Sequence, residues 1–203
     1  MNFEPTVFVI DDDPAVRNAM RFLLESVQMN VQTFASAELF LQTYTVHMIG
    51  CAVVDVRMPG MSGLQLQQRL IQQAFSLPMI FITGHGDVPL AVRAMQNGAA
   101  HFLEKPLDDQ LLLDAINAAL AQDKINQQKR LQLMTIQARL ANLTEREHQV
   151  FTLVIDKTPS KQIAEKLGIS LKTVEYHRAR MMEKMHADSI LDLLEMTRDA
   201  RLI

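Results

Sequence analysis

Short apolar runs that end in acidic or polar residues are the feature that most constrains the fold of the first 120 residues. Val7–Ile10 runs directly into three aspartates, and Cys51–Val54 runs into Asp55. Further β-rich runs are Val31–Phe34, Met79–Ile82 and His101–Leu103. Mostly apolar strands separated by amphipathic stretches are typical of a parallel sheet covered on both faces. We therefore predict a doubly wound α/β domain with five parallel strands, whose ligand site lies outside the carboxyl ends of the strands.

Helical patterns fill the intervals between these runs. Apolar residues recur at helical spacing from Pro14 to about Gln28, and Ser36 is suited to cap a short helix through Gln42. The longest stretch, Asp108–Leu143, contains neither proline nor glycine and favours helix throughout. We interpret it as the last helix of the α/β domain running into a helical linker. A bend is expected near Asn126, and the sequence leaves open whether the stretch is one helix.

After Leu143 the sequence predicts only short helices. Thr144 and Glu147 have the spacing of a capping box. Thr158-Pro159 has the pattern of an N-cap followed by a first-turn proline, and Gly168 should end that helix. Two helices joined by a short glycine-containing turn are typical of a helix-turn-helix unit. The recognition helix is expected at Leu171–Met185 and a fourth helix at about Ser189–Asp199. We predict an α/β domain at 1–121, a helical linker at 122–140 and a small all-α domain at 141–203.

Composition and charge favour a cytoplasmic protein with a phosphate-binding end. The 203 residues are 48% hydrophobic and 21% charged, and no apolar run approaches the roughly 20 residues of a membrane span. No export signal is visible, and the single cysteine, Cys51, is expected to be a small buried residue. Residues 1–120 carry a net charge of −6 and residues 121–203 a net charge of +3. The basic second half is suited to approach phosphates.

Carboxylates gather where the predicted strands end. Asp11 and Asp12 follow the first strand and Asp55 closes the third, so these side chains should converge on one crevice. Three carboxylates held together need a cation, and hard oxygen ligands suit Mg²⁺. Thr83 ends the fourth strand and Lys105 follows the fifth, so a hydroxyl and an ammonium group should face the same crevice. This set is suited to receive a phosphoryl group on a carboxylate. Asp13 has the alternative role of a turn former. The three histidines of this domain, His47, His85 and His101, are not spaced as a metal site, and we assign them surface or loop roles.

In order and spacing, these motifs resemble the CheY-type receiver domain. The matching stretches are Ile10–Asp13, Val53–Gly63, Ile82–Gly86 and Phe102–Pro106. The resemblance implies that Asp55 accepts a phosphoryl group from the phosphohistidine of a sensor histidine kinase. It implies that Asp12, Asp55 and the backbone carbonyl of Arg57 hold Mg²⁺ directly, with Asp11 helping through water. Thr83 and Phe102 match the family's switch pair, and Lys105 matches its phosphoryl-stabilising lysine. The resemblance also implies that phosphorylation changes the conformation of the face formed by the fourth helix, fifth strand and fifth helix. In this family, that face commonly forms a dimer. We also expect a cis peptide bond at Lys105-Pro106.

The stretch from Leu143 to about Leu194 resembles the LuxR-type helix-turn-helix, most closely the FixJ subgroup. The matching residues are Leu143, Thr144, Arg146, Glu147, Val150, Lys161, Ile163, Ala164, Leu167, Ile169, Ser170, Thr173, Val174, His177, Arg178, Lys184 and Met185. The resemblance implies binding to double-stranded promoter DNA, with two recognition helices of a dimer in successive major-groove turns. The fourth helix is the expected dimer surface.

Helical spacing separates the buried and DNA-facing sides of the recognition helix. Val174, Met181 and Met185 share a face suited to the core. The expected phosphate contacts are Lys161, Lys172, Thr173, Arg178 and Lys184. The expected base-reading residues are Glu175, Tyr176 and Ala179, with His177 and Arg180 on the same contact surface. A solvated charged face is the alternative interpretation.

Lys157 departs from the LuxR-type pattern, which usually has glycine at this position before Thr158-Pro159. If the position needs a positive φ, lysine carries strain there. Alternatively, Lys157 adds a phosphate contact, and the sequence does not decide between the two.

We therefore predict a transcriptional response regulator of a two-component phosphorelay. Phosphorylation of Asp55 would promote homodimerisation and promoter binding, with transcription activation as the outcome and RNA polymerase as a possible further partner. No turnover of an external substrate is expected. A phosphohydrolase is one alternative, but Arg57 stands where its acid–base aspartate would be and a capping insertion is missing. A constitutive DNA-binding protein with an inert receiver is the other, but it would lack the acceptor, the lysine or the acidic pair.

Overall fold

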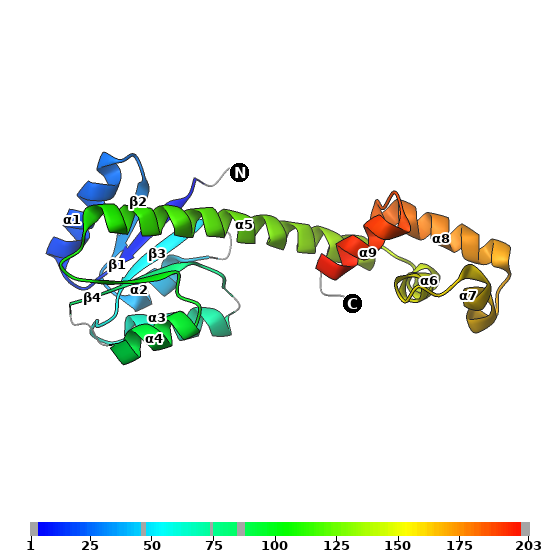
Figure 1. Ribbon diagram of the computed structural model, residues 1–203, viewed down its shortest axis with the longest axis horizontal. Coiled ribbons are helices and arrows are strands. Elements are labelled where there is room, and N and C mark those ends of the chain that lie inside the picture. Colours follow the sequence, from blue (N-terminus) through cyan, green and yellow to red (C-terminus); the bar gives the residue numbers. More distant parts are fainter. Residues whose placement is uncertain (1–3, 46–47, 74, 85–87, 200–203) are drawn as a thin grey trace. The chain divides into compact units, whose positions relative to one another are not determined.

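The computed structural model describes residues 4–45, 48–73, 75–84 and 88–199 of the chain. The chain divides into two compact units, Met1–Gln127 and Gln128–Ile203 (Figure 1). His47 and His85, to which the sequence assigned surface or loop roles, lie outside the described residues.

The first unit is a five-stranded parallel sheet with strand order β2-β1-β3-β4-β5. This topology confirms the predicted doubly wound α/β fold. The sequence indicated every strand to within one residue at either end, whereas it did not delimit α3 and α4. The elements are β1 Thr6–Ile10, α1 Pro14–Ser26, β2 Asn30–Phe34, α2 Ala37–Thr43, β3 Gly50–Asp55, α3 Gly63–Gln72, β4 Met79–Thr83, α4 Val88–Gln96 and β5 His101–Glu104, followed by α5.

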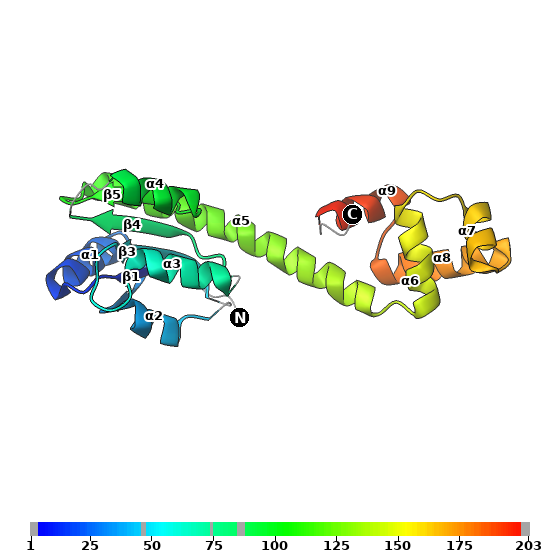
Figure 2. The same ribbon diagram turned by 90° about the horizontal axis from the view of Figure 1, so that it is seen from below.

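Helices cover both faces of the sheet (Figure 2). Met20 and Leu24 of α1 and Leu112 and Ile116 of α5 pack on one face, against Val7, Val9 and other inward side chains of the strands. The other face is covered by α2, α3 and α4, and its core includes a cluster of Phe8, Phe40 and Tyr44 rings. Burial on both faces explains why the central strands are apolar at successive positions. Cys51 is buried there as expected, and burial and the nearby Asp123 carboxylate raise the pKa of its thiol to about 12.

Helix α5 spans Asp109–Ala141 as one element. It includes Asn126, where the sequence favoured a bend, and so answers the question of whether the stretch forms a single helix. Its buried Asp123 accepts a hydrogen bond from the backbone N–H of Gly50 at 2.9 Å, which fixes the start of β3 to the first unit's part of α5. None of the described helices is long and apolar enough to cross a membrane.

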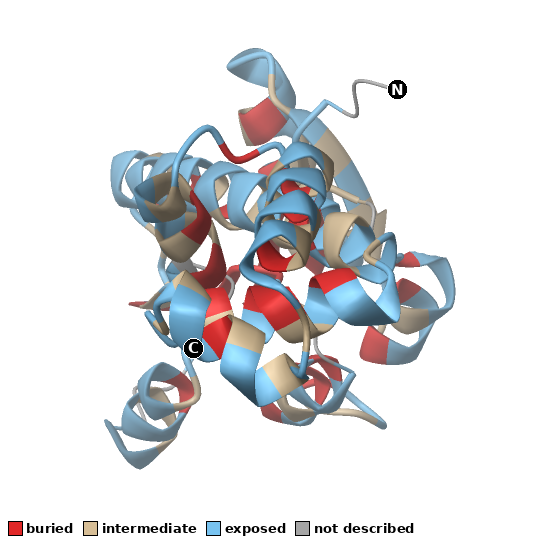
Figure 3. Ribbon diagram, turned by 90° about the vertical axis from the view of Figure 1, so that its right-hand side faces the viewer, coloured by how far each residue is buried: buried red, intermediate tan, exposed pale blue. Residues whose placement is uncertain are grey.

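The second unit contains the end of α5 and four short helices: α6 Glu145–Ile155, α7 Ser160–Leu167, α8 Leu171–Met185 and α9 Ile190–Asp199. Its core gathers Ile136 from α5, Val150 from α6, Ile163 from α7 and the predicted inward residues of α8, which are Val174, Met181 and Met185. Figure 3 shows the buried residues on the inner sides of these helices and exposed residues on the outer sides.

Local signals fixed most of the helix ends in the second unit. Thr144 and Glu147 form the predicted capping box, and Gly168 ends α7 with φ 65°. The predicted start of α7 was wrong by one residue. Pro159, rather than Thr158, is the N-cap, because its carbonyl accepts the first helical hydrogen bond, from the N–H of Ile163 at 3.0 Å.

Candidate functional site

Two buried carboxylates meet one ammonium group at the carboxyl edge of the sheet. The register pairs Ile10 of β1 with Val54 of β3, so the next residues, Asp11 and Asp55, lie side by side. The Nζ atom of Lys105 lies 2.9 Å from Asp11 Oδ2 and 2.8 Å from Asp55 Oδ1. Lys105 therefore bridges the two carboxylates and neutralises part of their mutual repulsion. The bond between Lys105 and Pro106 is cis, as expected.

The second oxygen of each carboxylate is held by the backbone. Asp11 Oδ1 accepts a hydrogen bond from the N–H of Asp13 at 2.8 Å, and Asp55 Oδ2 accepts one from the N–H of Arg57 at 2.7 Å. Asp13 in turn caps α1 by accepting from the N–H of Ala15. Asp13 therefore serves as the N-cap that starts α1. Both carboxylates are thus fixed in direction before any ligand arrives.

Burial and hydrogen bonding oppose each other in this pocket. Burial raises the pKa of Asp11 above its usual value, although the hydrogen bonds from Lys105 and the Asp13 amide act to lower it. Burial alone would lower the pKa of Lys105, but its hydrogen bonds to Asp55 and Asp11 outweigh burial and raise that pKa. The lysine therefore stays charged at neutral pH, as a permanent counter-ion for the acidic pair.

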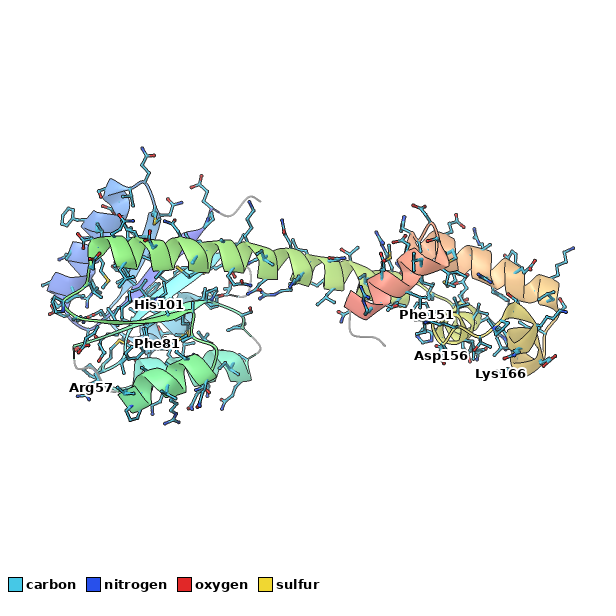
Figure 4. All side chains as sticks on the ribbon, viewed as in Figure 1. Arg57, Phe81, His101, Phe151, Asp156 and Lys166 are labelled. Carbon is cyan, nitrogen blue, oxygen red and sulfur yellow. The ribbon has the colours of Figure 1, made fainter. Side chains whose placement is uncertain are left out.

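The remaining predicted pocket residues lie on the strands and loops of the same domain. Asp12 is exposed on the loop after β1, and Thr83 is buried at the end of β4. Arg57, labelled in Figure 4, lies in the loop after β3 and is exposed. Phe102 of β5 is half-buried and packs against the core on the side of α2, α3 and α4. The fold thus brings Asp11, Asp55 and Lys105 into direct contact. Asp12 and Arg57 lie in the loops after β1 and β3, Thr83 ends β4 and Phe102 lies within β5.

The donor set of the pocket is compatible with Mg²⁺. Across the described residues, no three His, Cys, Asp or Glu side chains are gathered as a metal cluster. Nevertheless, Asp11 and Asp55 already hold a cation between them, the ammonium of Lys105. Mg²⁺ binds through few carboxylates and keeps several waters, so it does not need a third side chain in direct contact. Two fixed carboxylates, an exposed Asp12 and a nearby backbone carbonyl meet that requirement.

In the second unit, one face of α8 is open to solvent. Lys172, Glu175, Tyr176, Ala179 and Arg180 are exposed and follow one another at the spacing of a single helix face. Tyr176 is 61% exposed, and its ring makes an edge-on contact with the ring of His177. The predicted base-reading residues therefore share one accessible surface, and Lys161 on α7 is exposed as well.

Other predicted contact residues take part in local contacts. Arg178 Nη1 donates to Ser160 Oγ at 3.1 Å, and the hydroxyls of Thr173 and Ser170 lie 2.7 Å apart in the cap of α8. Arg180 is paired with Glu183 on the surface.

Lys184 has a buried partner. Its Nζ lies 2.6 Å from Glu147 Oε2 and also donates to the carbonyl oxygen of Asn142 at 3.2 Å. The hydrogen bond from Lys184 lowers the pKa of Glu147 below its usual value. These contacts tie the C-terminal turn of α8 to the start of α6, so Lys184 supports the packing of the unit.

Lys157 has a left-handed backbone conformation in the turn between α6 and α7. Its φ is 58°, in the left-handed region. The N–H of Lys157 donates to the carbonyl of Val154, and the N–H of Thr158 donates to the carbonyl of Leu153. These two bonds form a Schellman motif, in which glycine is the usual residue at the left-handed position. The positive φ that the sequence raised as a possibility is therefore present.

Comparison with known families assigns both units. Residues 7–117 match the response regulator receiver domain. Residues 141–197 match the luxR family of bacterial regulatory proteins. The chain is a LuxR-type response regulator.

Similar proteins match along nearly the full length of this response regulator. Transcriptional regulatory protein TdiR of Thauera aromatica is 46% identical over 93% of this chain and 83% of its own. Transcriptional regulatory protein FixJ of Azorhizobium caulinodans is 45% identical over 94% of this chain and 90% of its own. Among solved structures, response regulator StyR has a TM-score of 0.84 at 43% identity and covers 96% of this chain and 98% of its own. Full-length FixJ from B. japonicum has a TM-score of 0.58 at 39% identity over both whole chains.

Sequence reasoning missed the residues that support the receiver pocket from outside it. Glu38 of α2 accepts a hydrogen bond from the N–H of Met61 at 2.9 Å and so braces the loop after β3. Backbone hydrogen bonds of this kind lower the pKa of Glu38. Arg17 of α1 donates to the carbonyl oxygen of Asp11 at 2.6 Å. Long side chains that meet a distant backbone atom leave no periodic signal in a sequence, whereas the strand-end acids do.

Proposed function

We propose that a phosphoryl group on Asp55 switches this response regulator between a resting form and a promoter-binding homodimer. The observation that carries the proposal is the pair of buried carboxylates, Asp11 and Asp55, bridged by Lys105 at the carboxyl edge of the sheet. Such a pocket offers a carboxylate nucleophile beside fixed positive charge. The same pocket is the place where a phosphoryl group's oxygens would be neutralised.

The proposed reaction is phosphoryl transfer from the phosphohistidine of a cognate sensor histidine kinase. A carboxylate oxygen of Asp55 forms a bond to phosphorus while the phosphorus–nitrogen bond of the donor breaks, and the departing imidazole takes up a proton. Asp12, Asp55 and the backbone carbonyl of Arg57 would hold Mg²⁺ directly, and Asp11 would do so through water. Bound there, Mg²⁺ would neutralise charge on the transferred oxygens. Lys105 leaves its bridge and stabilises the new phosphoryl group.

The switch passes through Thr83 and Phe102. Thr83 is buried at the end of β4, and we propose that its hydroxyl moves toward the phosphoryl group on Asp55. Phe102 is half-buried on the neighbouring β5, and we propose that its ring turns inward when Thr83 moves. The rearranged face of α4, β5 and α5 would then join two copies of the chain.

The DNA-binding part of the proposal uses the exposed face of α8. Glu175, Tyr176 and Ala179 would read bases, and His177 and Arg180 would contact the same DNA segment. Phosphate contacts would come from Lys161, Lys172, Thr173, Arg178 and Lys184. Most of these base-reading and phosphate-contacting residues are exposed, which supports their proposed contact with DNA. Lys184 would have to leave Glu147 before it could contact DNA.

We propose that residues 1–121 act as the receiver, residues 122–140 as the linker and residues 141–203 as the DNA-binding domain. We propose that the protein works in the bacterial cytoplasm as a transcription activator and contacts RNA polymerase. Loss of the phosphoryl group by the receiver's own hydrolysis is the only turnover we propose.

Intact-mass measurement tests the acceptor. The full-length protein is incubated with MgCl₂ and acetyl phosphate, beside Asp55→Asn and beside Asp12→Asn as a variant that keeps the acceptor. Wild type should gain one phosphoryl group only with Mg²⁺, Asp55→Asn should gain none, and Asp12→Asn should gain it slowly. A phosphoryl group on Asp55→Asn would place the acceptor elsewhere. Release of phosphate from small phosphomonoesters would instead favour a phosphohydrolase.

A further inference from the structure

Arg17 makes a contact with the acid pocket that the proposed chemistry does not use. It lies in the first turns of α1, half-buried, and its Nη1 donates to the backbone carbonyl oxygen of Asp11 at 2.6 Å. On the other side, the N–H of Asp11 donates to the carbonyl of Phe34 in β2 at 3.2 Å. The backbone of Asp11 is therefore held by a hydrogen bond at its nitrogen and by a charged hydrogen bond at its oxygen.

The carbonyl of Asp11 and the N–H of Asp12 belong to one planar peptide group. A bond that fixes the direction of the Asp11 carbonyl therefore also fixes the plane in which the Cα of Asp12 lies. Asp12 is exposed on a loop, whereas the side chain of Asp11 is buried and ion-paired with Lys105. The guanidinium of Arg17 is thus a restraint on the residue expected to bind the metal directly.

We propose that Arg17 is a positioning residue that sets the peptide between Asp11 and Asp12 for metal binding. This inference rests on the Mg²⁺ site of the proposed function. Arg17 acts through the backbone and does not itself touch the metal or the phosphoryl group. Residues that orient metal ligands in this way typically change metal affinity about 10-fold or more when they are replaced.

The charge of Arg17 and its positioning role predict opposite effects of its removal on Mg²⁺ affinity. Arg17 is a cation near a cation site, so electrostatics alone would make its removal tighten Mg²⁺ binding. If positioning dominates, removal weakens Mg²⁺ binding instead. The sign of the change therefore separates the two roles. Arg21 supplies a matched control, because it lies one turn further along α1 and its Nη2 donates to Asn18 Oδ1, within the helix.

The test compares the full-length wild type with Arg17→Met, Arg17→Lys and Arg21→Met. Methionine keeps an apolar stem of similar length and removes the charge. Mg²⁺ affinity is measured by calorimetric titration with MgCl₂, and melting temperature is measured without Mg²⁺. Initial phosphorylation rates with acetyl phosphate are followed as a function of Mg²⁺ concentration. Arg17→Gln is the second neutral variant if Arg17→Met lowers the melting temperature.

We expect Arg17→Met to raise the Mg²⁺ dissociation constant about 10-fold, with a phosphorylation rate at saturating Mg²⁺ close to that of wild type. Arg17→Lys should recover part of the affinity, and Arg21→Met should stay within about twofold of wild type or bind slightly tighter. Equal or tighter binding by both Arg17→Met and Arg17→Gln would overturn the inference alone. An equal loss in Arg21→Met would also overturn it. No Mg²⁺ binding by wild type would overturn the proposed metal site and the inference together.

Discussion

Replacing Lys157 by glycine should stabilise the second unit, because its backbone already has the conformation that glycine prefers. Lys157 has φ 58° at the left-handed position of a Schellman motif. A left-handed conformation costs an L-residue with a Cβ about 1–2 kcal/mol. Glycine avoids that cost but loses about 0.5–1 kcal/mol more chain entropy on folding. The net expectation is a gain of about 0.5–1 kcal/mol, or an increase in melting temperature of about 2–8 °C for a domain of this size.

The assay is differential scanning calorimetry of the full-length protein, in which the transition of the second unit is assigned by its response to the substitution. Lys166→Gly is the matched control, since it removes the same charge from the last turn of α7, where φ is helical. Glycine within a helix costs about 1 kcal/mol. The two lysine-to-glycine substitutions should therefore move the melting temperature in opposite directions.

A lower melting temperature for Lys157→Gly, or equal shifts in both variants, would refute the conformational reasoning. The Lys157→Gly variant also tests whether Lys157 contacts a DNA phosphate, the alternative role that the sequence left open. If Lys157 contacts a DNA phosphate, Lys157→Gly should reduce the slope of log affinity against log salt by about 1. An unchanged slope would mean that Lys157 does not contact a DNA phosphate and affects only the conformation of the turn.

Three further substitutions test the receiver and the DNA-binding unit. A Cβ on Gly63 would lie 2.5 Å from the carbonyl oxygen of Asp55 and 3.2 Å from the Phe81 ring, so Gly63→Ala should destabilise the receiver by about 1–3 kcal/mol in urea unfolding. The depressed pKa of Glu147 means that its bond to Lys184 stabilises the fold above the unfolded-state pKa of about 4.3 and is lost as pH falls through the folded-state value. Glu147→Gln should flatten the melting temperature of the second unit across this acidic window, and an unchanged pH profile would argue against the pair. Lys172→Ala should weaken DNA binding uniformly across sequences and reduce the salt slope by about 1, whereas a sequence-dependent loss would assign Lys172 to base reading.

Patterns that repeat along the chain allowed the fold to be predicted. The strands of the buried sheet are apolar at successive positions, and α8 has a polar start signal and an apolar stripe, so its bounds at Leu171 and Met185 were predicted correctly. The helices α3 and α4 were not delimited, and the N-cap of α7 was placed one residue early at Thr158. At helix starts, neighbouring polar residues compete for the capping role, and backbone geometry decides among them.

The candidate site in the receiver was also predicted only in part. The sequence was sufficient to place Asp11, Asp55 and Lys105 at one edge of the sheet, because parallel strands bring their carboxyl ends together. It did not predict that the lysine would bridge both carboxylates, nor that Arg17 would hold the carbonyl of Asp11. Such contacts depend on side-chain rotamers and on chain segments that meet only after folding.

The central claim is that the phosphoryl group on Asp55 controls assembly, and light scattering coupled to size-exclusion chromatography tests it most directly. Wild type and Asp55→Asn are each measured with MgCl₂, with and without acetyl phosphate, and the same samples are titrated onto a DNA fragment selected by the phosphorylated protein. We predict that acetyl phosphate shifts wild type alone from monomer to dimer and increases its DNA affinity. Equal dimerisation and DNA binding by Asp55→Asn under acetyl phosphate would contradict the account.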